Sequence, residues 1–279
     1  MSSRRRVRLG DLAVTLDEPA AQRRGTILLL HGIGGSADTF AGLAPRLAAD
    51  GWRTIAWDAP GYGESADPGP GFPGADAPGT YVAAVTALLA ELGVSQVHLA
   101  GVSWGGVIAT HVATRRPEVV ASLTLIDSTR GSGRSAERAA AMRGRAPELE
   151  RVGAAAYAAA RAPRLLADAA DPAVAAEVER QMAALRASGY AGAAEMMAQS
   201  DTGAALSGIG VPTLVLVGDQ DRVTGVDESR LLARTIPGAR LGLIGHAGHA
   251  AVQERPAAVA EAISTFLAEL PASEKELLS

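Results

Sequence analysis

Short, almost continuously apolar runs alternate with longer stretches of helical spacing along most of this chain of 279 residues. Such runs are typical of strands that are buried on both faces of a parallel sheet and are joined by crossover helices. The pattern therefore predicts an α/β fold. We expect strands at residues 26–30 (TILLL), 54–57 (TIAW), 96–100 (QVHLA), 123–126 (LTLI), 213–217 (TLVLV) and 240–244 (RLGLI).

The first of these strands is preceded by a segment of different character. Residues 7–15 alternate roughly between apolar and polar positions around a Gly10-Asp11 pair, which predicts an antiparallel hairpin. Helical stretches fit between the strands that follow. They are expected at residues 37–49, 79–92, 104–116, 227–235 and 256–270.

The regular strand-to-helix spacing fails once, because residues 130–211 contain no convincing strand. A structureless loop of that length is uncommon in a compact domain, so we expect a helical insertion. The local composition RGSGRSAERAAAMRGR favours a disordered linker instead. The helical spacing of Val174, Val178, Met182 and Leu185 favours helices, because it produces an apolar face that needs a surface to cover.

Composition and charge narrow the class of protein. The chain has no cysteine, which excludes disulfides, thiolate metal sites and a cysteine nucleophile. Its net charge is −4 and its one basic run is RRR at residues 4–6, so we expect a solvated N-terminal tail and no nucleic-acid partner. The N-terminal segment lacks the apolar core of a secretory signal, and no apolar run approaches the roughly 20 residues of a membrane span. A soluble, cytoplasmic protein without a membrane partner is expected.

Gly101, Ser103 and Gly105 form the pattern G-x-S-x-G where a predicted strand meets a predicted helix. This context is the one in which the pattern places a nucleophilic serine on a sharp turn. Serine is a weak nucleophile that needs a neighbouring base, and the base needs a carboxylate to orient it.

The chain offers five histidines as the base. His31, His98 and His111 fall on a strand end, a strand and a helix, whereas His246 and His249 follow the last strand, in a loop that can return over the sheet edge. Both of these remain open on spacing alone.

For the carboxylate, the loop after residues 213–217 contains Asp219 and Asp221. Asp219 is placed to stabilise a turn, whereas Asp221 lies further into the loop and is better placed to reach the histidine. Asp127, at the end of the neighbouring strand, is the rival to Asp221.

Acyl transfer also requires donors for a developing oxyanion. The backbone amide of Trp104, which follows the serine, and that of Ile33, in the HGIGG loop, occupy the matching positions. The indole of Trp104 either narrows the acyl pocket or packs beneath the insertion. Arg130, shortly after the strand predicted at residues 123–126, is either a contact for a substrate carboxylate or a solvated side chain.

Five segments are informative together: HGIGG (31–35), WDAPGYGES (57–65), GVSWGG (101–106), GDQD (218–221) and GHAGHAAVQERP (245–256). With them, the chain resembles the α/β-hydrolase fold superfamily from residue 7 to residue 270. The resemblance implies a mostly parallel eight-stranded sheet with helices on both faces, and a helical lid inserted after strand 6. It implies core segments 1–129 and 212–279, a cap at 130–211, His249 as the base and Asp221 as the acid, with no role for Asp58 or Ser65 in catalysis.

The expected function is hydrolysis of a small ester or lactone through an acyl-enzyme, as in enol-lactonases and carboxylesterases, which this sequence resembles. The catalytic residues would be Ser103, His249 and Asp221, with Ile33 and Trp104 as the oxyanion hole, and no metal or cofactor is expected. C–C hydrolase, thioesterase and perhydrolase activities would use the same residues. A ligand-binding protein, or a lyase, isomerase or oxygenase, remains the alternative of another class.

Overall fold

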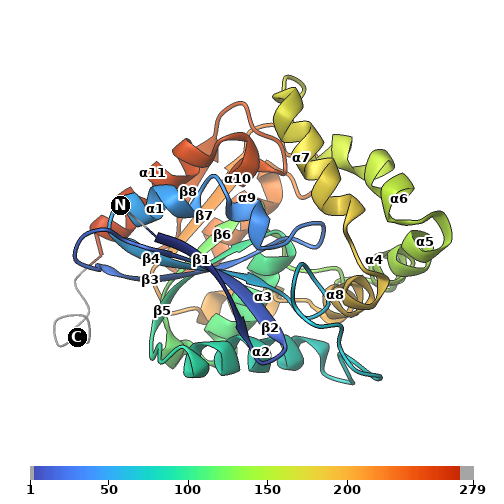
Figure 1. The fold of residues 1–279 in the computed structure, drawn as a ribbon, viewed down its shortest axis with the longest axis horizontal. Helices are drawn as coiled ribbons and strands as arrows, with labels where there is room; N and C mark the ends of the chain where they lie inside the picture. The colour runs from blue at the N-terminus through green and yellow to red at the C-terminus, as the bar shows by residue number, and fades with distance from the viewer. Residues whose placement is uncertain (1–2, 271–279) are drawn as a thin grey trace.

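A computed structural model of the chain describes residues 3–270. Within that range, eight strands form one sheet in the order β1-β2-β4-β3-β5-β6-β7-β8 (Figure 1). The pairs β1–β2 and β2–β4 are antiparallel and all other pairs are parallel, which confirms the predicted fold class. The strands are β1 (Ser3–Leu9), β2 (Leu12–Glu18), β3 (Gly25–Leu30), β4 (Trp52–Asp58), β5 (Val97–Val102), β6 (Val120–Ile126), β7 (Thr213–Gly218) and β8 (Arg240–Ile244).

Helices cover both faces of the sheet because the central strands are apolar on both sides. In β3, Ile27 and Leu29 belong to one buried cluster, and Leu28 and Leu30 to the other. The first cluster is completed by α1 (Ala44–Ala49) and α11 (Pro256–Ala268), and the second by α2 (Ala77–Glu91), α3 (Trp104–Arg115) and α9 (Val226–Thr235). Figure 1 shows α1 and α11 on the opposite side of the sheet from α2 and α3.

Two local predictions are wrong. The basic run at residues 4–6 is not a solvated tail but part of strand β1, which pairs with β2 over its whole length. The single helix predicted at residues 37–49 is divided into a 3₁₀ turn, η1 (Ala37–Phe40), and the short helix α1. Pro45 explains the division, because it has no amide hydrogen to continue a helix from η1 and is tolerated only in the first turn of a new one.

Residues between β6 and β7 form helices rather than a linker, as the apolar spacing predicted. In Figure 1 the helices α4 to α8 gather together at the right of the view, beside the sheet. The predicted boundaries of the cap remain a prediction, and the outermost parts of the predicted core, residues 1–2 and 271–279, lie outside the described residues. The elements are α4 (Ala136–Arg143), α5 (Arg145–Val152), α6 (Ala154–Arg161), η3 (Ala162–Leu165), α7 (Pro172–Ala183), α8 (Ala187–Gln199) and η4 (Gly203–Gly208).

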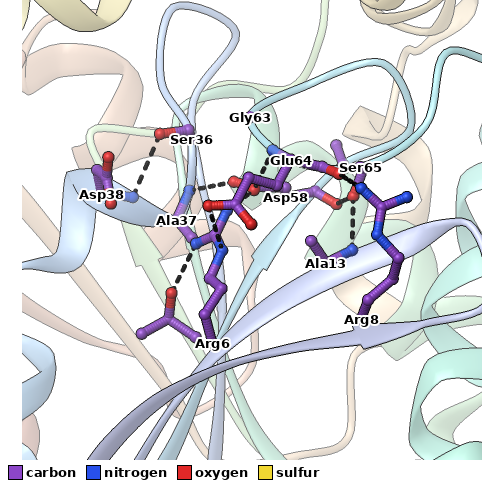
Figure 2. Close-up of polar contacts among 12 residues, drawn as sticks. Arg6, Arg8, Ala13, Ser36, Ala37, Asp38, Asp58, Gly63, Glu64 and Ser65 are labelled. Atoms are coloured by element: carbon purple, nitrogen blue, oxygen red, sulfur yellow. Dashed lines mark hydrogen bonds and ion pairs between the residues drawn. The ribbon is translucent and has the colours of Figure 1, made fainter.

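A buried carboxylate holds the N-terminal strand to the loops that follow β3 and β4 (Figure 2). Asp58, at the end of β4, accepts hydrogen bonds from the backbone amides of Ala37 (2.7 Å) and Glu64 (2.8 Å) and forms an ion pair with Arg6 of β1. The hydroxyl of Ser65 donates to the Asp58 carbonyl at 2.6 Å. These contacts are structural, as the resemblance implied for Asp58 and Ser65.

Of the helices in residues 3–270, none combines the length and the apolar character that crossing a bilayer requires.

Candidate active site

Ser103 lies at the sharp turn between β5 and α3. Its φ of 52° and ψ of −112° place it in the left-handed half of backbone space, which a non-glycine residue rarely occupies. The flanking glycines leave room for this turn, since a Cβ added to Gly105 would lie 2.1 Å from the Leu30 carbonyl oxygen and one added to Gly101 would lie 2.3 Å from the Gly105 carbonyl oxygen. The serine side chain is consequently held at the carboxyl edge of the sheet.

His249 and Asp221 come from two further loops at the same edge and contact each other. His249 Nδ1 lies 3.0 Å from Asp221 Oδ2, and both side chains are buried. Asp221 also accepts hydrogen bonds from the Thr224 hydroxyl (2.6 Å) and the Val223 amide (2.7 Å), which fix the carboxylate in place. With its Nδ1 proton directed at Asp221, the imidazole presents Nε2 as its free nitrogen.

The electrostatics of this pair favour a charged carboxylate. Burial raises the pKa of Asp221, but its hydrogen bond to His249 and the further donors outweigh burial and lower that pKa to about 2. Burial lowers the pKa of His249, but the hydrogen bond and charge of Asp221 outweigh it, so that the pKa lies above its ordinary value. The carboxylate therefore stabilises the protonated imidazole.

Ser103 and His249 line the same cavity, whose volume is about 600 Å³. Ile33 lies in its wall, together with apolar side chains of the insertion such as Val178 and Met182. Within residues 3–270, the Ser103 hydroxyl has no hydrogen-bond partner. Ser103 and His249 therefore face the same cavity without a direct hydrogen bond between them. Such contacts are often long in unliganded sites and tighten when substrate binds.

The two amides expected as oxyanion donors are available. No hydrogen bond inside the described part of the chain engages the backbone N–H of Ile33 or of Trp104. The Trp104 indole is fully buried and packs against Tyr62 and Tyr81, and its Nε1 lies 3.2 Å from the sulfur of Met196 in α8. Of the two interpretations of this indole, packing beneath the insertion is the one the structure supports.

The other histidines have structural partners or face solvent. The buried His31 donates from Nδ1 to the Gly32 carbonyl and accepts at Nε2 from the Ala59 amide, and burial lowers its pKa, so it is neutral. His98 and His111 contact serine hydroxyls. His246 is exposed and contributes its backbone carbonyl to Arg255.

The two rival carboxylates do not contact His249. Asp219 accepts from the Ala247 amide at 3.3 Å, the turn contact expected of it. Asp127 is fully buried with one oxygen on the Gly218 amide and the other without a partner among residues 3–270, and burial raises its pKa to about 8. A carboxyl that is neutral below that pH cannot replace Asp221 as the charged partner of the imidazole.

Arg130 meets neither expectation, because it is neither solvated nor aimed at the cavity. Its Nε and Nη2 lie 3.0 Å and 3.1 Å from the carboxylate of Glu228 on α9. Four other arginines, which no sequence pattern singled out, line the cavity instead. They are Arg145, Arg161, Arg164 and Arg222.

No group of three or more His, Asp or Glu side chains within residues 3–270 is arranged to hold a metal ion.

Comparisons with known proteins identify the family of this fold. A family model described as alpha/beta hydrolase fold matches residues 25–256. A putative carbamate hydrolase, RutD, of Pseudomonas syringae is 28% identical over 261 residues, which is 88% of this chain and 95% of that protein. A 3-oxoadipate enol-lactonase of Acinetobacter baylyi is 29% identical over 220 residues, 78% of this chain and 79% of that protein.

Among solved structures, a thermophilic esterase from Thermogutta terrifontis superposes with a TM-score of 0.83 at 28% identity, over 96% of this chain and 98% of that one. Three further curated relatives match over 102 residues each, and the chain spans only 26% to 31% of their length.

Proposed function

This chain belongs to the α/β-hydrolase fold family, and from that premise we propose that it is a serine hydrolase of small esters or lactones. The observation that carries the proposal is the His249–Asp221 contact on the cavity that Ser103 also lines. The similar carbamate hydrolase, enol-lactonase and esterase bear names that imply attack on an acyl carbon, which supports the same class of reaction.

In the proposed mechanism, His249 accepts the proton of Ser103 at Nε2 while the serine oxygen attacks the substrate carbonyl. The amides of Ile33 and Trp104 donate to the oxyanion that forms. His249 then protonates the leaving alkoxide. Afterwards it takes a proton from the water that attacks the acyl-enzyme and returns that proton to the Ser103 oxygen as the carboxylic acid leaves. Asp221 keeps the imidazole in the productive tautomer and stabilises its cation.

The decisive experiment treats the purified protein with a fluorophosphonate probe and locates the adduct by mass spectrometry, while p-nitrophenyl ester hydrolysis is followed in parallel. We expect one adduct, on Ser103, and a Ser103→Ala variant that loses both the adduct and about 10⁶-fold in kcat. Ser188→Ala is the matched control, because Ser188 is an exposed serine of the insertion whose hydroxyl is bound to Asp67 at 2.7 Å. Labelling elsewhere, or turnover that persists in Ser103→Ala, would contradict the proposal.

The competing activities differ in substrate and not in residues. Assays of thioester hydrolysis, peracid formation and C–C bond cleavage separate these possibilities. In each assay, an activity that belongs to this site should be lost in Ser103→Ala and kept in Ser188→Ala.

A further inference from the structure

The cavity is lined by charged side chains of one sign. Four arginines contribute to its wall, and no aspartate or glutamate does, although the chain as a whole carries a net charge of −4. Three of these arginines belong to the insertion, and Arg222 follows Asp221 in the core. A cleft lined by one sign of charge attracts ligands of the opposite sign.

Two of the four arginines are already neutralised by carboxylates. Arg161 lies 2.7 Å from Glu148, and Arg222 lies 2.7 Å from Asp168. Their positive charge is therefore largely balanced before any ligand binds.

Arg145 and Arg164 differ from this pair. Among residues 3–270, neither side chain forms an ion pair or a hydrogen bond. Arg145, the first residue of α5, is half-buried, whereas Arg164 in η3 is exposed. Arg145 is also close enough to His249 for its charge to act on the imidazole. The charge of Glu148, which forms its ion pair with Arg161, also acts on Arg145 and balances its charge only in part. A half-buried guanidinium with no ion pair of its own among the described residues, in the wall of the cavity that Ser103 and His249 line, is suited to a charged substrate.

We propose that the substrate carries a carboxylate which binds Arg145, with Arg164 in support, while its ester or lactone carbonyl lies at Ser103. This inference rests on the proposed function and specifies its substrate class. A guanidinium binds a carboxylate through two parallel N–H donors, which fixes orientation as well as charge. Leu165, Leu166, Val178 and Met182 supply an apolar wall for the carbon chain between the two ends.

The first test compares two p-nitrophenyl esters with acyl chains of equal length, the monoester of pimelate and the ester of heptanoate. We expect kcat/KM to be about tenfold higher for the anionic ester at low ionic strength, and the preference to decline as salt is added. Arg145→Gln should remove most of that preference, measured as the ratio of kcat/KM for the two esters on the same variant. Arg164→Gln should act in the same direction but less, because it is more exposed.

Arg138→Gln is the matched control, since Arg138 is an exposed arginine of the same insertion, its side chain has no ion-pair partner among the described residues, and it does not line the cavity. Equal rates for the two esters, or a preference that survives in the Arg145→Gln, Arg164→Gln double variant, would overturn the inference while Ser103-dependent turnover of the heptanoate ester upholds the proposed function.

A binding measurement keeps the two ideas separate. Pimelate titrated calorimetrically into Ser103→Ala should bind at least about tenfold more tightly than into Ser103→Ala with Arg145→Gln. This readout needs no turnover, so it tests the carboxylate site even if neither ester is hydrolysed. Equal affinities would overturn it.

Discussion

Asp221 determines how His249 is oriented and how strongly it holds a proton. The carboxylate is fixed by Thr224 and Val223 and accepts a hydrogen bond from the Nδ1–H of the imidazole. The pKa of the nearby Asp127 shifts in the opposite direction. Burial raises it to about 8, and only one of the two carboxylate oxygens has a hydrogen-bond donor among the described residues. Two carboxylates at the ends of neighbouring strands therefore differ in charge at neutral pH because their hydrogen-bond donors differ.

The pH profile of the enzyme tests the role of Asp221. Since His249 must be neutral to accept the serine proton, and since its pKa is raised, kcat/KM for an uncharged ester should increase with pH through a pKa above 6.5 and then level off. Asp221→Asn should move that inflection to lower pH and reduce kcat by about 10⁴-fold. The measurement is a pair of pH–rate profiles.

Asp219→Asn is the control for this substitution, because Asp219 belongs to the same loop but its side chain accepts from the Ala247 amide and does not contact His249. An inflection that stays in place in Asp221→Asn would argue against the proposed charge interaction.

A residue's role could be predicted from the sequence where neighbouring residues mark it, and not where it depends on a distant partner. Ser103 is marked by glycines on either side of it, at a strand–helix junction. Arg130 could not be assigned, because its partner Glu228 is 98 positions away and lies on an otherwise ordinary amphipathic helix. The cavity-lining arginines were missed for the same reason, since their positions depend on how the helices of the insertion pack.

Among the elements, α9 fastens the start of the insertion to the core. The carboxylate of Glu228 accepts from the Arg130 side chain, from the Arg130 amide at 3.0 Å and from the Thr129 hydroxyl at 3.1 Å, and it also pairs with Arg134. Burial raises the pKa of Glu228, but these donors and charges outweigh it and lower the pKa to about 2. The chain leaving β6 is thus held at four points by one side chain.

Glu228→Gln should therefore lower the free energy of unfolding by about 1–3 kcal/mol at pH 7, because a charged acceptor is lost from several donors. The folded-state pKa lies below the ordinary value of 4.5, so this stabilisation exists above that pH and is lost as the pH falls towards 2. Urea denaturation at pH 7 and at pH 3 measures both parts. The difference between variant and wild type should be smaller at pH 3.

Asp227→Asn offers a neighbouring comparison, since the Asp227 side chain is 95% exposed and pairs only with Arg230. We expect a change of less than about 0.5 kcal/mol there. A similar loss in both variants would show that Glu228 is no more than a surface charge.

Strands could be predicted more closely than helices at this scale. The two-sided burial of β3 and β7 leaves continuous apolar runs in the sequence, and β8 was expected with the bounds it has. The single helix predicted at 37–49 is wrong because its alanine-rich composition favours a helix throughout, whereas Pro45 fits only in the first turn of a new helix, which begins at Ala44.

Over the whole molecule, the Asp58 network joins segments that are distant in sequence. It connects β1, the start of η1 and the loop after β4 through one buried carboxylate (Figure 2). The N-terminal strand is therefore tied to the region that follows the HGIGG loop, and with it to the proposed oxyanion donor Ile33.

Asp58→Ala should cost about 3–5 kcal/mol of unfolding free energy, since it leaves two amides and the Arg6 guanidinium without their acceptor. Chemical denaturation gives the value directly. Glu64→Ala is the matched comparison, because the Glu64 side chain is 66% exposed, lies 3.4 Å from Arg6 and leaves the Asp58 contacts intact. Equal losses of unfolding free energy in the two variants would show that the stabilisation comes from surface charge and not from the buried hydrogen bonds of Asp58.

The insertion leaves the core after β6 and returns to it at β7, and these two strands are hydrogen-bonded neighbours. Evolution, or an engineer, can therefore exchange this segment for another without breaking the sheet, because its two ends already lie together. Contacts between the insertion and the core limit which replacements fit, and two of them show how. The Ala167 amide is bound by Glu254 at 2.9 Å, and Gly189 packs so closely on Gly61 that an added Cβ would lie 2.3 Å from the Gly61 carbonyl oxygen. Under the proposed function, an exchange of this segment would replace the part of the cavity wall that the insertion supplies and keep the part that the core supplies, provided that the new segment keeps attachments such as these.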